Sequence, residues 1–356
     1  MRFYKEHHKF YTGIDLHART MYVCVMDNDG DVVFHKNMAA TPECLQHVIL
    51  PYGTDIVIGV ECIFTWYWIA DFCSDRSIPF ALGHALYMKA IHGGKSKNDR
   101  IDSEKIAAML RGGMFPIAYV YPRDMRATRD LLRRREYFVR HQAELFTHIE
   151  NTNSQYNYNS TLTKGRMRSA TYRATLPEQF GDPVAQKNIK ADMFLADAFH
   201  RLILDLEQEI QRQAKTHDPF SLALLRTIPG IGEILSLVIL YEIEDIHRFP
   251  NVGNFISYCR LVKCAHESAG KRVKGGNDKI GNTHLKWAYS EASVLFLRNN
   301  EPAQKLHDRL VKKYGKAKAL SIIAQKLART SYYMLKRKEP FVKTRFFQDG
   351  VSEHPA

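Results

Sequence analysis

The order of apolar patterns in the first 111 residues constrains the fold more than any other feature. Residues 10–17 and 20–26 alternate apolar and polar side chains and are rich in β-branched and aromatic types, which predicts two strands. A turn at 27–30 leads into a third strand. The elements expected after it are a helix at 41–50, a strand at 55–61, a helix at 65–76, a strand at 78–84 and a helix that begins near Asp99. This order predicts a mixed sheet covered by helices, an α/β arrangement.

The middle of the chain has a helical pattern. Two long helices are expected, one from about residue 122 and one at about 190–216, and arginines recur about a turn apart along the first. The segment at 151–173 is polar and aromatic, which predicts a loop or an interaction segment. The pattern fits a coiled-coil hairpin that links two domains, and it fits equally well a helical layer on the first domain.

The last part of the chain is expected to be mostly α-helical, with helices to about residue 298 and then at 301–314 and 316–338. Near its start, Gly230 and Gly232 lie between two apolar helices. This helix-hairpin-helix-like turn could present backbone N–H groups to a phosphate, although a plain turn between two helices would have the same sequence pattern. The predicted divisions are an α/β domain at 1–120, a helical linker with a polar insertion at 121–220, a mostly α domain at 221–345 and a tail at 346–356.

Positive charge is concentrated towards the C-terminal end. The formal net charge is +13. Residues 1–115 carry 12 Lys+Arg and 13 Asp+Glu, a net −1; residues 116–225 carry 16 and 13, a net +3; residues 226–356 carry 23 and 12, a net +11. Such an excess attracts polyanions, usually nucleic acid, although a basic surface can serve solubility alone.

The cysteines and the hydropathy pattern bear on the cellular compartment. The six cysteines form no Cys-x-x-Cys pair, and no segment resembles a signal peptide. No apolar run approaches the roughly 20 residues that a bilayer span requires. These features predict a cytoplasmic protein with no membrane partner.

Four carboxylates fall at related places in the predicted sheet. Asp99 and Asp102 lie three positions apart, on one face of a helix start, where acids also commonly complement the helix dipole. Asp15 lies within the first strand and Glu61 ends the fourth. In the ribonuclease H-like fold, which has this order of elements, these strands are neighbours and the last helix packs over them. The four acids would then hold Mg²⁺, or Mn²⁺, and two such ions about 4 Å apart can assist phosphodiester cleavage.

Basic residues surround the carboxylates at the helix start. Lys95, Lys97 and Arg100 lie beside Asp99 in the sequence. We expect these three side chains to hold the DNA backbone near the metal ions.

Six short motifs follow one another along the chain: GIDLH at 13–17, GVECIFTWYW at 59–68, KNDRID at 97–102, IPGIG at 228–232, HESAGK at 266–271 and GNTHLKWA at 281–288. On these motifs the sequence resembles the DEDD transposases of bacterial insertion sequences, the IS-one-ten family, and the related Piv-type DNA invertases. The resemblance extends from about residue 10 to 340. It implies a RuvC-like nuclease domain, a helical linker and a C-terminal domain with an essential serine.

Matched by motif, the acids of that family fall on Asp15, Glu61, Asp99 and Asp102, and its serine falls on Ser268. The sequence departs from the usual pattern at Arg260 and Ala269, and the neighbouring serines 257, 290 and 293 compete for the assignment. A serine hydroxyl that attacks a phosphodiester conserves the bond energy in a phosphoserine, so that strands can be rejoined without a nucleotide cofactor. Nearby bases could hold the phosphate or only grip DNA: Lys271, Arg272 and Lys274.

The expected function is that of a DNA transposase or recombinase. The resemblance implies donor and target DNA, a structured guide RNA, and further copies of the chain in a dimer or tetramer as partners. Two enzymatic alternatives are a Piv-like site-specific invertase and a RuvC-like metal-dependent nuclease in which water attacks. The non-enzymatic alternative is a nucleic-acid-binding protein with a decayed site.

Overall fold

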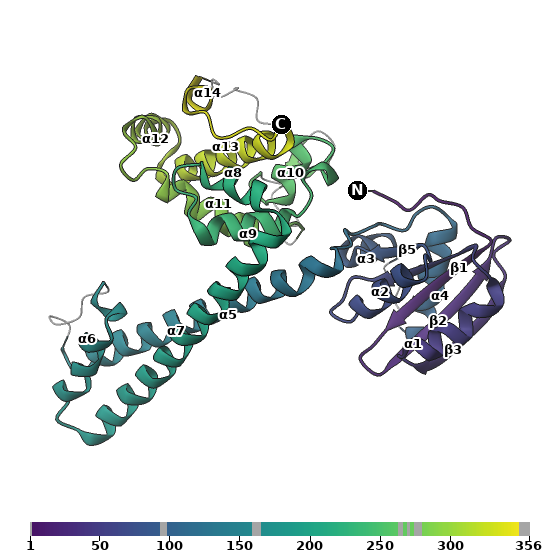
Figure 1. Ribbon diagram of the computed structural model, residues 1–356, viewed down its shortest axis with the longest axis horizontal. Helices are drawn as coiled ribbons and strands as arrows, with labels where there is room; N and C mark the ends of the chain where they lie inside the picture. Colours follow the sequence, from purple (N-terminus) through teal and green to yellow (C-terminus); the bar gives the residue numbers. More distant parts are fainter. Residues whose placement is uncertain are drawn as a thin grey trace. The chain divides into compact units, whose positions relative to one another are not determined.

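The computed structural model describes residues 2–92, 98–158, 165–262, 266–268, 271–273 and 280–348. Lys95, Lys97 and Lys274, three of the predicted nucleic-acid ligands, lie outside these ranges. The chain divides into two compact units, Met1–Arg123 and Asp124–Ala356 (Figure 1). The further division of the second unit into a linker and a C-terminal domain remains a prediction.

The first unit is built on a five-stranded mixed sheet, as predicted. Its strands are β1 Phe10–Leu16, β2 Thr20–Asp27, β3 Val32–Ala39, β4 Ile56–Glu61 and β5 Phe80–Gly83, in the order β3-β2-β1-β4-β5. The first three form an antiparallel meander, whereas β4 is parallel to β1 and β5 is parallel to β4. The two parallel neighbours place the carboxyl ends of β1, β4 and β5 at one edge of the sheet.

Helices cover both faces of this sheet. The helical segments of the unit are α1 Pro42–Ile49, the 3-10 turn η1 Leu50–Tyr52, α2 Tyr67–Asp75, α3 Ala85–His92 and α4 Asp99–Arg111. The apolar residues of α1 and α2 pack with Ile14, Leu16 and Ile58 on one face, and those of α4 pack with Tyr11 and Val57 on the other. The sequence did not predict α3, which follows β5 directly.

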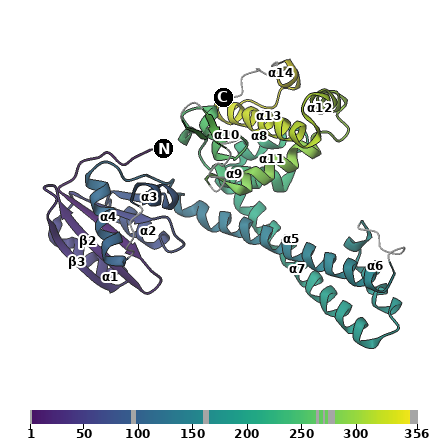
Figure 2. The ribbon, with the colours of Figure 1, turned by 180° about the vertical axis from the view of Figure 1, so that it is seen from behind.

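Two long helices dominate the first part of the second unit (Figures 1 and 2). They are α5 Arg123–Gln155, which starts at the last residue of the first unit, and α7 Pro183–His217. They run antiparallel, because Arg135 Nε contacts Glu207 at 2.8 Å while Gln142 Nε2, further along α5, reaches the Ala196 carbonyl of α7 at 2.8 Å. The predicted loop at 151–173 is wrong in part: α5 extends into it, and η3 Arg166–Arg168 and α6 Ala170–Thr175 occupy its end, before η4 Pro177–Gln179.

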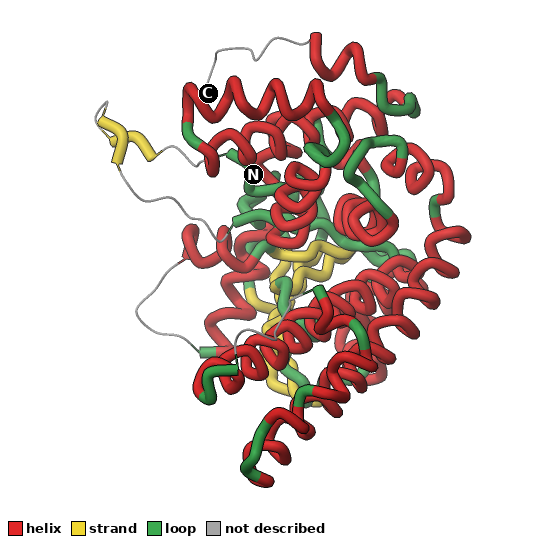
Figure 3. Tube along the Cα trace, turned by 90° about the vertical axis from the view of Figure 1, so that its left-hand side faces the viewer, coloured by secondary structure: helices red, strands yellow, loops and turns green. Residues whose placement is uncertain are grey.

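The remainder of the second unit is a helical bundle with one small hairpin. Its elements are α8 Pro219–Arg226, α9 Glu233–Ile243, η5 Ile246–Arg248, α10 Val252–Tyr258, β6 His266–Ser268, β7 Lys271–Val273, α11 Thr283–Leu295, α12 Glu301–Tyr314, α13 Lys316–Arg337 and α14 Lys343–Gln348. The helices predicted at 301–314 and 316–338 are confirmed within one residue. The hairpin, in yellow at the edge of Figure 3, and α14 were not predicted.

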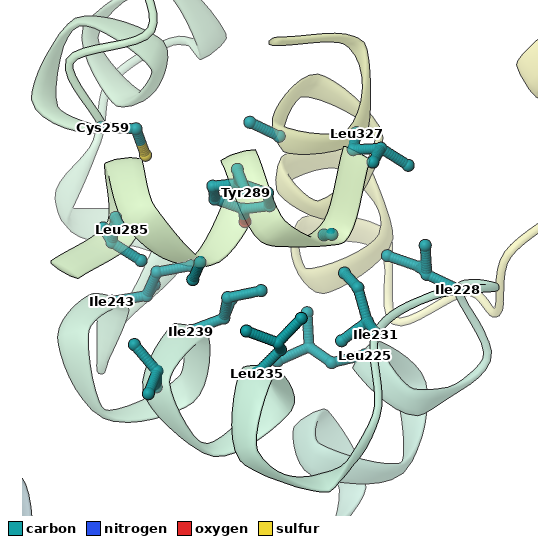
Figure 4. Packing of buried hydrophobic residues seen from close by; sticks show 14 of the residues in the cluster. Leu225, Ile228, Ile231, Leu235, Ile239, Ile243, Cys259, Leu285, Tyr289 and Leu327 are labelled. Carbon is teal, nitrogen blue, oxygen red and sulfur yellow. The ribbon is translucent and has the colours of Figure 1, made fainter. Parts of the chain in front are cut away.

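The core of this bundle forms around α9, because every residue from Leu235 to Ile243 is buried. Side chains from α8, α9, α11 and α13 meet there, as Figure 4 shows for Leu225, Ile239, Tyr289 and Leu327. A helix that is apolar all round needs neighbours on every side. Across the described ranges, no helix is both long and apolar enough to cross a membrane.

Candidate active site

Two glycines seat helix α4 against the sheet. A Cβ atom at Gly13 would lie 2.1 Å from the Ser103 carbonyl oxygen of α4, and one at Gly59 would lie 2.6 Å from the Leu110 side chain. Gly13 and Gly59 face each other in the register of β1 and β4. Helix and sheet therefore approach each other more closely than any side chain would allow.

The register of β1 and β4 brings the first two carboxylates to one place. Ile14 pairs with Val60, so the next residues of the two parallel strands are Asp15 and Glu61. Because side chains alternate along a strand, Asp15 lies on the same face as Gly13, which is the face that α4 covers. Both carboxylates are partly buried.

The start of α4 carries the other two carboxylates over this edge. Asn98 caps the helix, and its side chain accepts a hydrogen bond from the Arg100 backbone N–H at 3.0 Å. Asp99 is the first helical residue and Asp102 is in the same turn, where acids also complement the helix dipole. Lys105 lies one turn further on, with Nζ 3.6 Å from Asp102 Oδ1.

The other three carboxylates are near enough to Asp15 to act on its charge. Burial raises the pKa of the Asp15 carboxyl, the nearby His17 lowers it, and the negative charges of Asp99, Asp102 and Glu61 raise it again. Like charges at short range disfavour ionisation unless a cation offsets them. A site of this kind favours the binding of a cation.

A histidine completes the cluster. The Nε2 atom of His17 lies 3.6 Å from Asp15 Oδ2 and 3.3 Å from Asp99 Oδ2. One ligand atom from each of these residues lies within 4.8 Å of the other two, a spacing that fits a single metal ion. Hard carboxylate oxygens suit Mg²⁺, Mn²⁺ and Ca²⁺. The residue types and their spacing therefore fit a divalent metal.

His17 was not among the residues proposed from the sequence. The available signal was period-two alternation, because residues 13, 15 and 17 share one face of a strand. The spacing from His17 to Asp99 depends on the packing of α4, which the sequence pattern does not specify. A second histidine, His35, fixes that packing: its Nε2 lies 3.0 Å from the Arg100 carbonyl oxygen and 3.1 Å from Ser103 Oγ.

Gly230 and Gly232 form a turn between α8 and α9, as predicted. Gly230 has φ +85°, and a Cβ there would lie 2.5 Å from the Phe296 backbone nitrogen. The conformation and the close approach both require glycine, so packing alone accounts for this residue. Gly232 caps α9 without a side chain, and a Cβ there would meet nothing within 4 Å. Its use as a phosphate ligand remains a prediction.

Ser268 is the last residue of β6. It pairs with Lys271 in the β6–β7 hairpin, and Arg272 pairs with Glu267. Two competing serines have local structural roles: Ser290 Oγ donates to the Lys286 carbonyl at 2.7 Å, and Ser293 Oγ donates to the Ser290 carbonyl at 2.7 Å. Hydroxyls that bond back along their own helix are common.

Several arginines of α5 are committed to ion pairs. Arg123, which belongs to the first unit, contacts Asp71 and Asp75 of the same unit at 3.1 and 3.0 Å. Arg129 and Arg133 both bind the buried carboxylate of Glu242. The regular spacing of these bases along α5 therefore reflects packing as well as charge.

Family models match both units. One, described as "Transposase" and named for the DEDD transposases of IS110, matches residues 12–157. The other, described as "Transposase IS116/IS110/IS902 family", matches residues 222–308. The first match includes all four carboxylates, and the second includes Ser268 and Gly230.

Two curated relatives are similar over nearly their whole length. The "Transposase for insertion sequence element IS1111A" of Coxiella burnetii is 23% identical over 340 residues, which cover 92% of this chain and 90% of that protein. The "Transposase for insertion sequence element IS1328" of Yersinia enterocolitica is 24% identical over 354 residues, which cover 93% of this chain and 98% of that protein.

The two family models match the chain one after the other, and both describe transposases. The protein class is therefore that of the transposases, which bind DNA and cut and transfer its strands. The chain belongs to the IS110 family of DEDD transposases.

Proposed function

We propose that this transposase cuts and rejoins DNA through a phosphoserine formed on Ser268, with Asp15, Glu61, Asp99 and Asp102 holding one or two divalent metal ions. The observation that carries the metal-site proposal is the convergence of acids from β1, β4 and α4 at one edge of the sheet. Lys105 is paired with Asp102 and His17 lies between Asp15 and Asp99, and a bound cation would offset the remaining negative charge of the cluster.

The carboxylates act as a preorganised set. Asp15 lies on strand β1, and α4 packs closely against that strand at Gly13. Contacts of Asn98 and His35 fix the start of α4. Ligands held in this way lose little freedom when they bind a metal or orient a phosphate. When bound, Mg²⁺ or Mn²⁺ would supply positive charge that offsets the charge developing on the phosphate oxygens.

Ser268 would act as the nucleophile. Its Oγ attacks the scissile phosphorus and loses its proton to a base, the bond from phosphorus to the leaving sugar oxygen breaks, and that oxygen takes up a proton. Attack by a second sugar hydroxyl on the phosphoserine reverses these steps and rejoins the strands. Support for this role comes from the HESAGK motif, which lies inside the second matched family region.

The nucleic-acid partners are donor DNA, target DNA and a structured guide RNA, bound by a homo-oligomer. The net +11 of residues 226–356 supports a polyanion-binding role for the C-terminal end. Arg100, exposed beside the carboxylates, would contact a phosphate there. Lys271 and Arg272 on β7 would contact another near Ser268.

Replacement of two acids tests the proposal. The double variant Asp99→Asn with Asp102→Asn should bind DNA and fold as the wild type does, yet cut no strand in Mg²⁺ or Mn²⁺. Glu104→Gln is the matched control, because Glu104 lies on the same helix outside the cluster and should leave cleavage intact. Normal cleavage by the double variant would contradict the metal-site proposal.

A further inference from the structure

We propose that His17 is a ligand of the divalent metal at this site and supplies it with a nitrogen donor. The inference rests on the proposed function only in assuming that Asp15 and Asp99 bind a metal. A histidine ligand is a residue type that the four-carboxylate motif does not contain, and its nitrogen affects which metals the site prefers.

The distances have the spacing of adjacent metal ligands. Nε2 of His17 lies 3.3 Å from Asp99 Oδ2 and 3.6 Å from Asp15 Oδ2. In an octahedral site with bonds of about 2.1 Å, neighbouring ligand atoms are about 3 Å apart. Both distances from His17 are therefore close to that spacing, and the three donor atoms all lie within 4.8 Å of one another.

The backbone holds His17 in this position. Its N–H donates to the Thr20 carbonyl at 2.8 Å, which closes the turn between β1 and β2. It follows Asp15 by two residues, so both side chains leave the same face of the chain. About half of the imidazole surface is exposed, which leaves the ring free to adjust when a metal enters.

The polar contacts of His17 differ from those of His35, another histidine of the first unit. Among the described residues, the ring of His17 meets only the two carboxylates of the site. His35 is instead committed to the Arg100 carbonyl and Ser103 Oγ, which makes it an anchor for α4. Of these two histidines, only His17 directs a nitrogen at the carboxylates.

An imidazole ligand changes the metal preference. Mn²⁺ also prefers oxygen donors, but as a transition ion it accepts an imidazole nitrogen more readily than Mg²⁺, which is bound almost entirely by oxygen. The site should therefore favour Mn²⁺ over Mg²⁺ by more than a site of carboxylates alone. Loss of His17 should weaken Mn²⁺ binding about tenfold or more, the usual size of a lost contact around a metal, and weaken Mg²⁺ binding much less.

Pulsed electron paramagnetic resonance of Mn²⁺ bound to the full-length protein tests this directly. Wild-type protein should show a ¹⁴N coupling that becomes a ¹⁵N coupling when only its histidines are labelled with ¹⁵N. His17→Ala should lose the coupling and bind Mn²⁺ about tenfold more weakly. His47→Ala is the matched control, because His47 is exposed on α1, which covers the opposite face of the sheet, and it should change neither result.

Asp15→Asn separates the two proposals. If Mn²⁺ binding weakens in Asp15→Asn but the wild-type spectrum shows no histidine nitrogen, the role of His17 is wrong and the carboxylate site stands. If Asp15→Asn leaves Mn²⁺ binding unchanged, the metal site itself is wrong, and the role of His17 with it. The spectrum of the ¹⁵N-labelled wild-type protein alone shows whether a histidine nitrogen binds the Mn²⁺.

Discussion

Arg129 of α5 and Glu242 of α9 form a buried ion pair, in which Nε and Nη2 of the arginine donate to Oε2 of the glutamate at 3.1 and 3.0 Å. Arg133 donates to the same carboxylate, as does Nδ2 of Asn282 at 2.7 Å. Asn282 also caps α11, the helix that follows the β6–β7 hairpin. The network therefore ties α5 and α9 to one end of the segment that carries Ser268.

Loss of this carboxylate should strongly destabilise the second unit. Glu242→Ala leaves two arginines without their buried partner, and we expect it to lower the free energy of unfolding by about 3–5 kcal/mol. Glu301→Gln is the control, because it breaks an exposed pair with Lys305 and should cost about 0.5 kcal/mol or less. Urea unfolding of the full chain measures both, and equal stability of the two variants would contradict a structural role for the network.

The same carboxylate should make stability depend on pH. Burial alone would raise the pKa of Glu242, but the hydrogen bond from Arg133 and the positive charges around it lower that pKa from 4.5 to about 2. Because the folded state holds the carboxylate ionised, this contribution is present above about pH 4.5 and is lost as the pH falls through about 2. The difference in thermal stability between wild type and Glu242→Gln should shrink steadily over that range, and a constant difference would contradict the assignment.

The close packing of α4 against β1 gives a separate prediction. Gly13→Ala places a Cβ against the Ser103 carbonyl, so the helix must move away from β1 and carry Asp99 and Asp102 with it. We expect weaker Mn²⁺ binding and little or no strand cleavage. Gly181→Ala, where a Cβ meets nothing within 4 Å, is the control and should behave as the wild type. Full cleavage by Gly13→Ala would show that the distance between α4 and β1 does not determine the positions of the metal-binding carboxylates.

Four exposed lysines at the turn between α12 and α13 should contribute to nucleic-acid binding: Lys312, Lys313, Lys316 and Lys318. Replacing all four with alanine should weaken DNA binding and reduce the slope of log K against log salt by about 1 for each lysine that contacts a phosphate. The control replaces four exposed bases of the first unit: Lys5, Lys9, Arg19 and Lys36. A larger loss in the control would place the main contact surface in the first unit.

The sheet and the position of the acids could be predicted because local patterns encode them. Alternation along β1, β2 and β4 specifies the strands, and parallel pairing of β1 with β4 follows from the intervening helix. The pairing then brings Asp15 beside Glu61 without further information. The short helix α3 was missed because it follows β5 with no break in the apolar pattern.

Long-range contacts explain what the sequence could not show. The arginines of α5 resemble a basic stripe, and only the fold reveals that Arg129 and Arg133 meet Glu242, more than a hundred residues away. The three-residue strands of the hairpin are too short for a period-two signal. The contact of His17 with Asp99 depends on the approach of α4 to β1, which involves glycine and not a recognisable ligand motif.

Mapping of the covalent attachment shows which residue, if any, forms a bond to DNA. Full-length protein is incubated with DNA that carries an end of the element, in Mg²⁺ or Mn²⁺, then denatured and digested, and the peptide that retains a nucleotide is sequenced by mass spectrometry. We expect a single phosphodiester on Ser268 that is absent from Ser268→Ala and from the Asp99→Asn, Asp102→Asn double variant, and unchanged in Ser293→Ala. Attachment at another residue, or metal-dependent cleavage by wild-type protein with no attached nucleotide, would contradict it.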